Sequence, residues 1–225
     1  MKERILELLD EGLMHWRKHH DKGRDEKAIH PSAIGNCLRR NYYTMTGAEC
    51  QPLSPKVYRI FDNGHSAHTR LANYFRRAGV LIAEEQPLRH EALNIKGSAD
   101  AIIDLDGERI LIDFKTIKDY PFKLMRDGKK QLDKTYRYQI NTYMWLLGLK
   151  KSFFVFENKN TQEFHVEPCE YDEEIINDIK DRIERLHKCI EDKAPPEKEY
   201  EPSNWHCEYC SFNKLCYGPD YKGKR

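Results

Sequence analysis

Residues 99–115 read ADAIIDLDGERILIDFK, with apolar alternating segments on both sides of Asp106-Gly107. Asp-Gly is a favoured dipeptide for the two-residue type I′ turn of a β-hairpin. With those two residues as the loop, Asp100 on the first strand faces Asp113 on the second. Residues that face each other across two strands hold their Cβ atoms about 4.5–5.5 Å apart. The sequence therefore predicts a pair of close carboxylates on one face of the hairpin.

Lys115 lies two residues beyond Asp113 and points to the same face of its strand. Two opposed carboxylates repel, and burying them unpaired is costly. A divalent cation removes that cost, because carboxylate oxygens suit Mg²⁺ or Mn²⁺, and a neighbouring lysine can stabilise negative charge that develops in a reaction. The alternative is a solvated face on which these residues are ordinary surface charges. The opposite face is the predicted core: Ala99, Ala101, Ile103, Leu105, Ile110, Ile112 and Phe114.

Apolar periodicity on either side of the hairpin predicts an α/β or α+β layout, with a strand cluster flanked by helices. Helices are expected over residues 1–20, from Ser32 through Cys37 to Tyr43, and over 55–77, 134–147 and 173–189. Strands are expected over residues 80–88, 91–96, 98–105, 109–116, 153–157 and 163–167.

Length and composition fit a single folded domain of 225 residues with 39% hydrophobic residues. Within it we expect a helical segment over 1–50, a core over 54–193 and a cysteine-rich segment over 194–225. The net charge of +1 gives no bulk electrostatic case for nucleic acid, so any such case must rest on local patches. The longest uncharged apolar run, 143–147, is too short to span a membrane, and no signal peptide is visible. We therefore expect no membrane partner and a cytoplasmic location.

Seven cysteines in a chain without an export signal make a disulfide framework unlikely. The spacing Cys207-x2-Cys210-x5-Cys216 instead indicates a metal centre, and Cys37 is the best candidate for a fourth ligand. Four cysteines are the usual ligands of a 4Fe–4S cluster. Structural zinc typically takes two close pairs of ligands, so zinc is the second choice, with His206 able to replace one cysteine.

Four short motifs resemble the RecB-like branch of the PD-(D/E)XK nucleases: Gly64-x3-His68, GSAD at 97–100, DFK at 113–115 and QINTY at 139–143. The resemblance implies a restriction-endonuclease-like core, which is a mixed sheet flanked by helices. It also implies roles for the site residues. The metal would be held by His68, Asp100, Asp113 and the Phe114 carbonyl. Lys115 would be the catalytic lysine, and Gln139 and Tyr143 would face the substrate.

With its remote cysteine and cysteine-rich tail, nearly the whole chain resembles the CRISPR-associated RecB-like exonucleases, the Cas four family. This implies a Mg²⁺- or Mn²⁺-dependent DNA exonuclease that acts on single strands from 5′ to 3′. It further implies an iron–sulfur staple that joins the N- and C-terminal segments, and a role in CRISPR spacer acquisition with the integrase proteins as partners. Two alternatives stay open: a stand-alone recombination or repair nuclease, which a virus could encode, and a catalytically silent scaffold that binds DNA ends.

The segment 116–138, between the lysine and Gln139, is basic, with seven Lys and Arg against three Asp. Tyr and Phe are interleaved with these charges, as in proteins that bind single-stranded nucleic acid. A solvated lysine-rich loop is the alternative. The predicted DNA contacts are Lys118, Lys129, Lys130 and Arg137, together with Arg39 and Arg40 near the cysteine centre.

Overall fold

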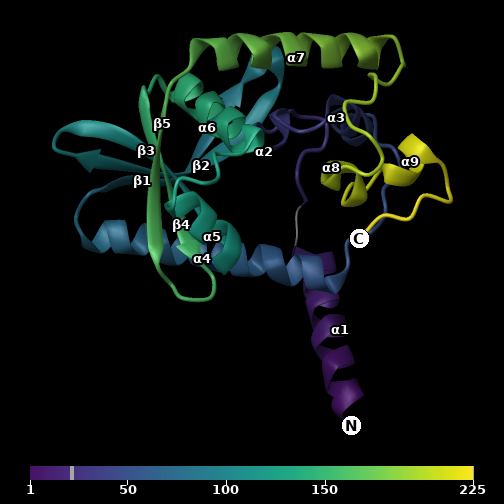
Figure 1. Ribbon diagram of the computed structural model, residues 1–225, viewed down its shortest axis with the longest axis horizontal. Helices are drawn as coiled ribbons and strands as arrows, with labels where there is room; N and C mark the ends of the chain where they lie inside the picture. The colour runs from purple at the N-terminus through teal and green to yellow at the C-terminus, as the bar shows by residue number, and fades with distance from the viewer. Residues whose placement is uncertain (21–22, 225) are drawn as a thin grey trace.

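A five-stranded mixed sheet forms the centre of the computed structural model, which describes residues 1–20 and 23–224 (Figure 1). Its strands lie in chain order, with β3 and β4 parallel and the other neighbours antiparallel. The predicted α+β class and mixed sheet are confirmed. The strands are β1 (Leu81–His90), β2 (Ile95–Leu105), β3 (Glu108–Ile117), β4 (Lys151–Asn158) and β5 (Phe164–Glu170).

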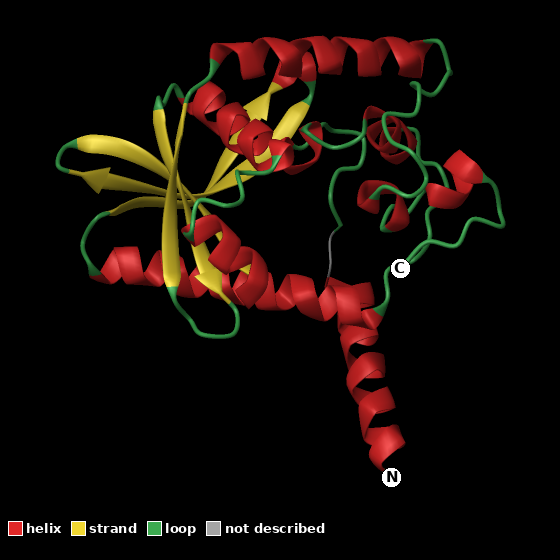
Figure 2. Cartoon of the chain, in the orientation of Figure 1, coloured by secondary structure: helices red, strands yellow, loops and turns green. Residues whose placement is uncertain are grey.

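Helices cover both faces of the sheet (Figures 1 and 2). They are α1 (Lys2–His20), α2 (Pro31–Ile34), α3 (Leu38–Met45), α4 (Pro55–Arg77), the 3₁₀ turn η1 (Glu91–Leu93), α5 (Asp119–Arg126), α6 (Lys134–Leu147), α7 (Glu173–Glu191), α8 (Trp205–Glu208) and α9 (Asn213–Tyr217). Helix α4 packs on one face, α5 and α6 pack on the other, and α7 lies over α6. The bounds of α4 and α6 are those predicted. No described helix is long and apolar enough to cross a membrane.

The β2–β3 hairpin has the predicted register, with Ala101 opposite Ile112. Its loop residues Asp106 and Gly107 have φ values of 55° and 85°, as a type I′ turn requires. The sequence predicted that one face of the hairpin is buried. In the structure helix α6 also covers the other face, which carries Asp113. Leu105, predicted to lie in the core, is instead 51% exposed beside the turn.

The predicted strand over 91–96 is wrong. Residues Glu91–Leu93 form a 3₁₀ turn, and Asn94 takes a left-handed conformation with φ of 48° before β2 begins at Ile95. The His90 ring accepts a hydrogen bond from the Leu93 N–H and so caps this turn. Strands β1 and β2 are consequently one hairpin, and β1 pairs with β2 along most of its length.

The single helix predicted from Ser32 is two helices. The first ends at Ile34. Gly35 follows it and passes so close to α6 that a Cβ atom there would lie 2.8 Å from the Thr135 Cα. Cys37 occupies the position before α3 and does not lie within a helix. This break orients Cys37 toward the C-terminal segment.

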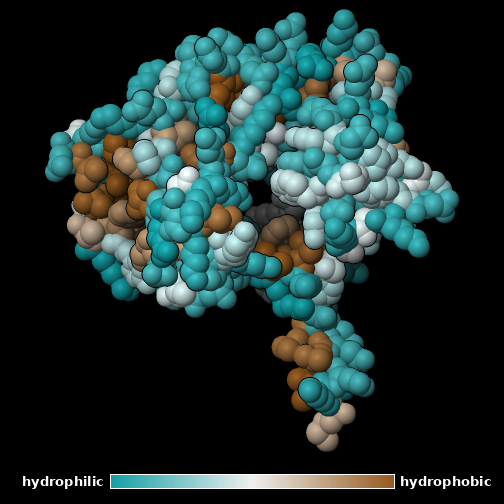
Figure 3. Space-filling model, viewed as in Figure 1, coloured by the Kyte–Doolittle hydropathy of each residue, from teal (hydrophilic) through white to brown (hydrophobic). Residues whose placement is uncertain are grey.

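Helix α1 is amphipathic, as predicted, but it buries none of its residues and projects from the body (Figures 1 and 3). Its apolar side chains, among them Leu9 and Trp16, face outward. Contact with α4 is polar: Arg17 lies 2.7 Å from Asp62, and Asp10 pairs with Arg59.

Arg182 of α7 links three distant segments. Its guanidinium donates to the carbonyls of Ile34 and Asn36, at 3.4 and 2.6 Å, and pairs with Glu199 at 3.3 Å. The Glu199 carboxylate in turn accepts the Leu38 N–H at the start of α3. This network ties the N-terminal segment to the chain that leads into the cysteine-rich tail.

Replacing Arg182 by methionine is expected to lower the free energy of unfolding by about 3 kcal/mol, because it leaves Glu199 and two carbonyls without their buried donor. Urea unfolding followed by circular dichroism measures this. The control is Arg185→Met on the exposed side of the same helix, which should change stability by less than about 0.5 kcal/mol. Equal effects of the two substitutions would contradict the structural role of the network.

Candidate active site

Asp113 of β3 is fully buried between the sheet and α6. Among the described residues, the Lys115 ammonium forms an ion pair with it, but neither carboxylate oxygen accepts a properly oriented hydrogen bond. Burial raises the pKa of Asp113 to about 6. A buried carboxylate needs a cationic partner, which Lys115 supplies here, and its remaining lone pairs can bind a metal ion.

Lys115 extends from β3 toward α6, where its ammonium donates to the Gln139 side-chain oxygen at 3.3 Å. It also lies 5.0 Å from the centre of the Tyr136 ring. Burial would lower the pKa of Lys115, but the nearby Asp113 and Asp100 carboxylates raise it above its ordinary value. The lysine therefore stays charged inside the site.

Asp100 of β2 accepts the Phe114 N–H at 2.8 Å and lies 3.4 Å from the His68 Nδ1 atom. Although burial alone would raise the pKa of Asp100, the hydrogen bond from His68 lowers it. For His68, burial alone would lower the pKa, but the hydrogen bond to Asp100 raises it above its ordinary value. His68 projects from α4 beside the Phe114 ring, whereas the competing candidate His65 is exposed.

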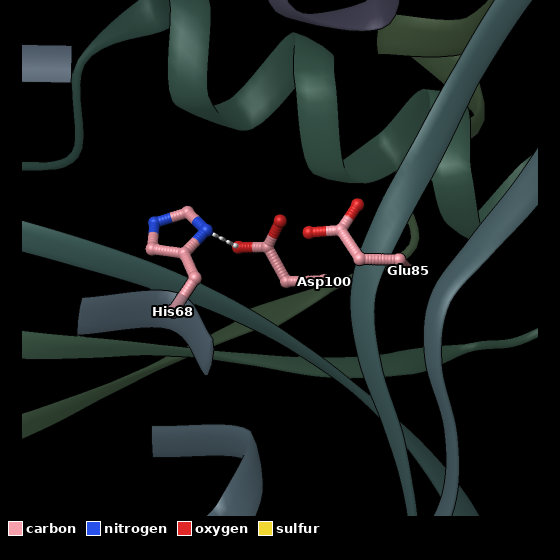
Figure 4. A group of neighbouring side chains, drawn as sticks. All are labelled: His68, Glu85 and Asp100. Carbon is pink, nitrogen blue, oxygen red and sulfur yellow. Dashed lines mark ion pairs between the residues drawn. The ribbon is translucent and has the colours of Figure 1, made fainter. Parts of the chain in front are cut away.

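Glu85 of β1 is a site residue that the sequence did not indicate. Ligand atoms of His68, Glu85 and Asp100 all lie within 4.8 Å of one another (Figure 4). The pairing of Glu84 with Ala101 and of Gln86 with Ala99 places Glu85 opposite Asp100. Glu85 has a left-handed φ of 47° and accepts the Ser98 hydroxyl at 2.7 Å. The signal was the β1–β2 register, which the mistaken strand at 91–96 concealed.

Gln139 and Tyr143 lie one turn apart on α6 and face the sheet. The Gln139 amide donates to the Tyr143 hydroxyl at 3.1 Å, and its oxygen accepts from Lys115. Burial raises the pKa of Tyr143, so its hydroxyl keeps its proton. The two side chains thus continue a hydrogen-bonded chain that begins at Lys115.

The side chains predicted to contact DNA differ in whether they already have a partner within the protein. Lys118, Lys129 and Lys130 are exposed and form no ion pair with any residue that the structure describes. Arg137 is paired with Asp172 at 3.3 Å, and Arg39 donates to the Pro196 carbonyl at 2.7 Å.

The interleaved aromatic residues of this segment are only partly available for stacking. Helix α5 forms within the segment, and Phe122 and Tyr138 are buried in the core. Tyr120 is exposed. The pattern that resembled a stacking surface therefore owes much to core packing.

Cys37, Cys207, Cys210 and Cys216 line one pocket with a volume of about 30 Å³. Its lining residues come from the start of α3, from residues 198–200 and from the two short C-terminal helices, which lie near α3 in the ribbon (Figure 1). Burial raises the pKa of the Cys37 and Cys216 thiols. In the described ranges, no three cysteine sulfurs lie within 4.8 Å of one another. Tetrahedral zinc, with Zn–S bonds of about 2.3 Å, would require a tighter group.

A mixed sheet with a hairpin that places an aspartate opposite a D-x-K sequence defines a class of nucleases. The chain belongs to the PD-(D/E)XK nuclease superfamily, whose sequence profile matches residues 18–217. No curated protein matches the chain by sequence.

Solved structures share the fold. The crystal structure of SSO0001 matches with a TM-score of 0.60 at 21% identity, over 95% of this chain and 96% of that one. An alkaline exonuclease from Laribacter hongkongensis, also solved in complex with dAMP, matches with a TM-score of 0.56 in that complex, at 16% identity, over 74% and 89%. A phage-related exonuclease from Haemophilus somnus gives 0.55 at 15% identity, over 74% and 94%.

Proposed function

We propose that this protein is a Mg²⁺- or Mn²⁺-dependent exonuclease that degrades single-stranded DNA from 5′ to 3′. The observation that carries the proposal is the Asp113 carboxylate, which is fully buried against the charged Lys115, near the group formed by His68, Glu85 and Asp100, whose ligand atoms lie within 4.8 Å of one another. A carboxylate in this state suits a hard cation. Family membership and the fold support hydrolysis of phosphodiester bonds as the reaction.

The donors available for the metal are His68, Asp100 and Asp113, with the Phe114 carbonyl carried over from the resemblance. Glu85 is a further candidate, because its carboxylate lies within 4.8 Å of the His68 and Asp100 ligand atoms. Asp113 lies outside this group of three among the described residues. Oxygen-rich sets with one imidazole fit Mn²⁺ and Mg²⁺. A divalent cation in this position would polarise the phosphate and lower the pKa of the attacking water.

The protein's own groups then complete the site. The Lys115 ammonium is held between Asp113 and Gln139, where it can stabilise negative charge that develops on the phosphate oxygens. Gln139 fixes the direction of the ammonium, and Tyr143 fixes Gln139. Lys118, Lys129 and Lys130 are free to contact the phosphate backbone, while Arg39, Arg40 and Arg137 are weaker candidates.

We further propose a 4Fe–4S cluster in the pocket formed by Cys37, Cys207, Cys210 and Cys216. The four thiols line one pocket, and four cysteines are the usual ligands of such a cluster. The cluster would join the segment before α3 to the tail, in the region where Arg182 and Glu199 already link them. Its role would be structural.

The cellular setting rests on the cysteine pattern alone. It suggests trimming of DNA in the cell for CRISPR spacer acquisition, beside integrase proteins. The presence of integrase genes next to the gene of this protein would support this setting, and their absence would favour a recombination or repair nuclease.

The experiment that tests the function follows single-stranded DNA labelled at its 5′ or 3′ end, with Mg²⁺, Mn²⁺ or EDTA. We expect cleavage with metal only, and release of short labelled products from the 5′ end first. An absence of cleavage with both metals, by protein that retains its cysteine-bound metal, would favour the scaffold.

Glu85→Gln is expected to raise the Mn²⁺ concentration needed for half-maximal cleavage by at least about tenfold, because an anionic ligand near Asp100 is lost. The matched control is Glu84→Gln, one residue away, where the carboxylate pairs with Arg76 outside the site. Metal titrations of cleavage and of metal binding both report the effect. If the two variants require the same Mn²⁺ concentration, Glu85 is not a ligand.

A further inference from the structure

Trp205 is an exposed aromatic residue that the nuclease site leaves unexplained. It is 56% exposed although it lies in the cysteine-rich segment, where its ring stacks on His206 with centroids 3.7 Å apart. His206 stacks in turn on Tyr200, with centroids 4.6 Å apart. This aromatic stack is fixed on one side and leaves much of the indole accessible.

The indole lines one side of a pocket. The segment that leads into α6 lines the other side. Lys130 and Gln131 of that segment and Tyr136 of α6 line the pocket. Tyr136 also lies beside Lys115, with the lysine nitrogen 5.0 Å from its ring centre. Figure 3 shows a hollow between the sheet-bearing body and the lobe that contains α8 and α9. The pocket is therefore next to the proposed site of cleavage.

The pocket holds one ammonium group that can contact the phosphate of a ligand. The Lys130 ammonium is exposed and has no ion-pair partner within residues 1–20 and 23–224. The one acid in the pocket, Asp133, is occupied in capping α6, where it accepts the Thr135 N–H at 2.9 Å. A nucleotide offers both features that the pocket matches, a flat base and a phosphate.

We propose that Trp205 is a stacking platform for one unpaired nucleobase of the DNA strand, with Lys130 at the adjacent phosphate. The base must be unpaired, because both faces of a base within a duplex are covered by its neighbours. This proposal rests on the proposed function and gives a structural reason for a preference for single strands.

The test measures binding without added divalent cation, so that it does not depend on cleavage. Fluorescein-labelled oligothymidylate and an abasic strand of equal length are compared by anisotropy. Trp205→Ala should weaken oligothymidylate binding about tenfold and leave abasic binding unchanged, whereas Trp205→Phe should restore most of the affinity. The control is Trp16→Ala, which removes an equally exposed indole on α1, far along the chain.

Tryptophan fluorescence provides a second measurement that does not depend on the stability of the alanine variant. Unlabelled oligothymidylate should quench the wild-type emission, and the quenching should be lost in Trp205→Phe but kept in Trp16→Phe. Equal weakening of both strands by Trp205→Ala, or unchanged quenching in Trp205→Phe, would overturn the proposal. Normal Trp205-dependent binding in a protein that cuts no DNA would instead refute only the nuclease function.

Discussion

Replacing Lys115 by methionine is expected to lower the rate of DNA cleavage about 10³-fold, the cost of removing a group that stabilises charge in the transition state. Methionine keeps the aliphatic stem of the lysine and removes the ammonium that pairs with Asp113 and lies over the Tyr136 and Phe154 rings. Circular dichroism checks that the variant is folded before cleavage rates are compared. The affinity for single-stranded DNA should change little, because the exposed lysines proposed to contact the phosphates, Lys118, Lys129 and Lys130, are unchanged.

The matched control is Lys151→Met, which removes an exposed lysine paired with Glu108 at the far end of the sheet. Single-turnover cleavage measures the chemical step, and anisotropy measures binding. A Lys115→Met protein that cuts DNA at the wild-type rate would remove Lys115 from the mechanism. Loss of binding in parallel with cleavage would assign it to the binding of DNA instead.

Cys37→Ser is expected to abolish the iron content and the brown colour of protein purified without oxygen, because a 4Fe–4S cluster needs its fourth thiolate. We also expect the tail to become accessible to protease, since the cluster would hold residues 194–225 against α3. Iron and sulfide analysis, visible absorbance and limited proteolysis report the outcome.

Cys50→Ser provides the matched control, because Cys50 is exposed and outside the pocket. It should retain iron, colour and resistance to protease. Wild-type protein that is colourless and contains one zinc ion would establish zinc as the metal. Full metal content in Cys37→Ser would exclude Cys37 as a ligand of either metal.

Local sequence was sufficient for the hairpin at the centre of the site. The Asp106-Gly107 turn fixes which residues of β2 and β3 face each other, and the predicted register is observed as far as Ala101 and Ile112, next to Asp100 and Asp113. Regular apolar spacing likewise gave the bounds of α4 and α6. Such features depend on interactions between residues close in the chain, which is why they can be predicted without a structure.

Other features depend on contacts between distant segments, and these were missed. Glu85 joins the site only because η1 and Asn94 turn β1 back along β2. The close approach of Gly35 to α6 divides a predicted helix in two.

The sequence by itself determined the hairpin, its opposed carboxylates and the lysine beside them. Only the tertiary structure decided that α6 buries Asp113 completely, and that Trp205 lies across a pocket from Lys130. The physical reason is that turn chemistry and strand alternation act over a few residues, whereas burial and long-range neighbours are set by how whole helices pack on the sheet.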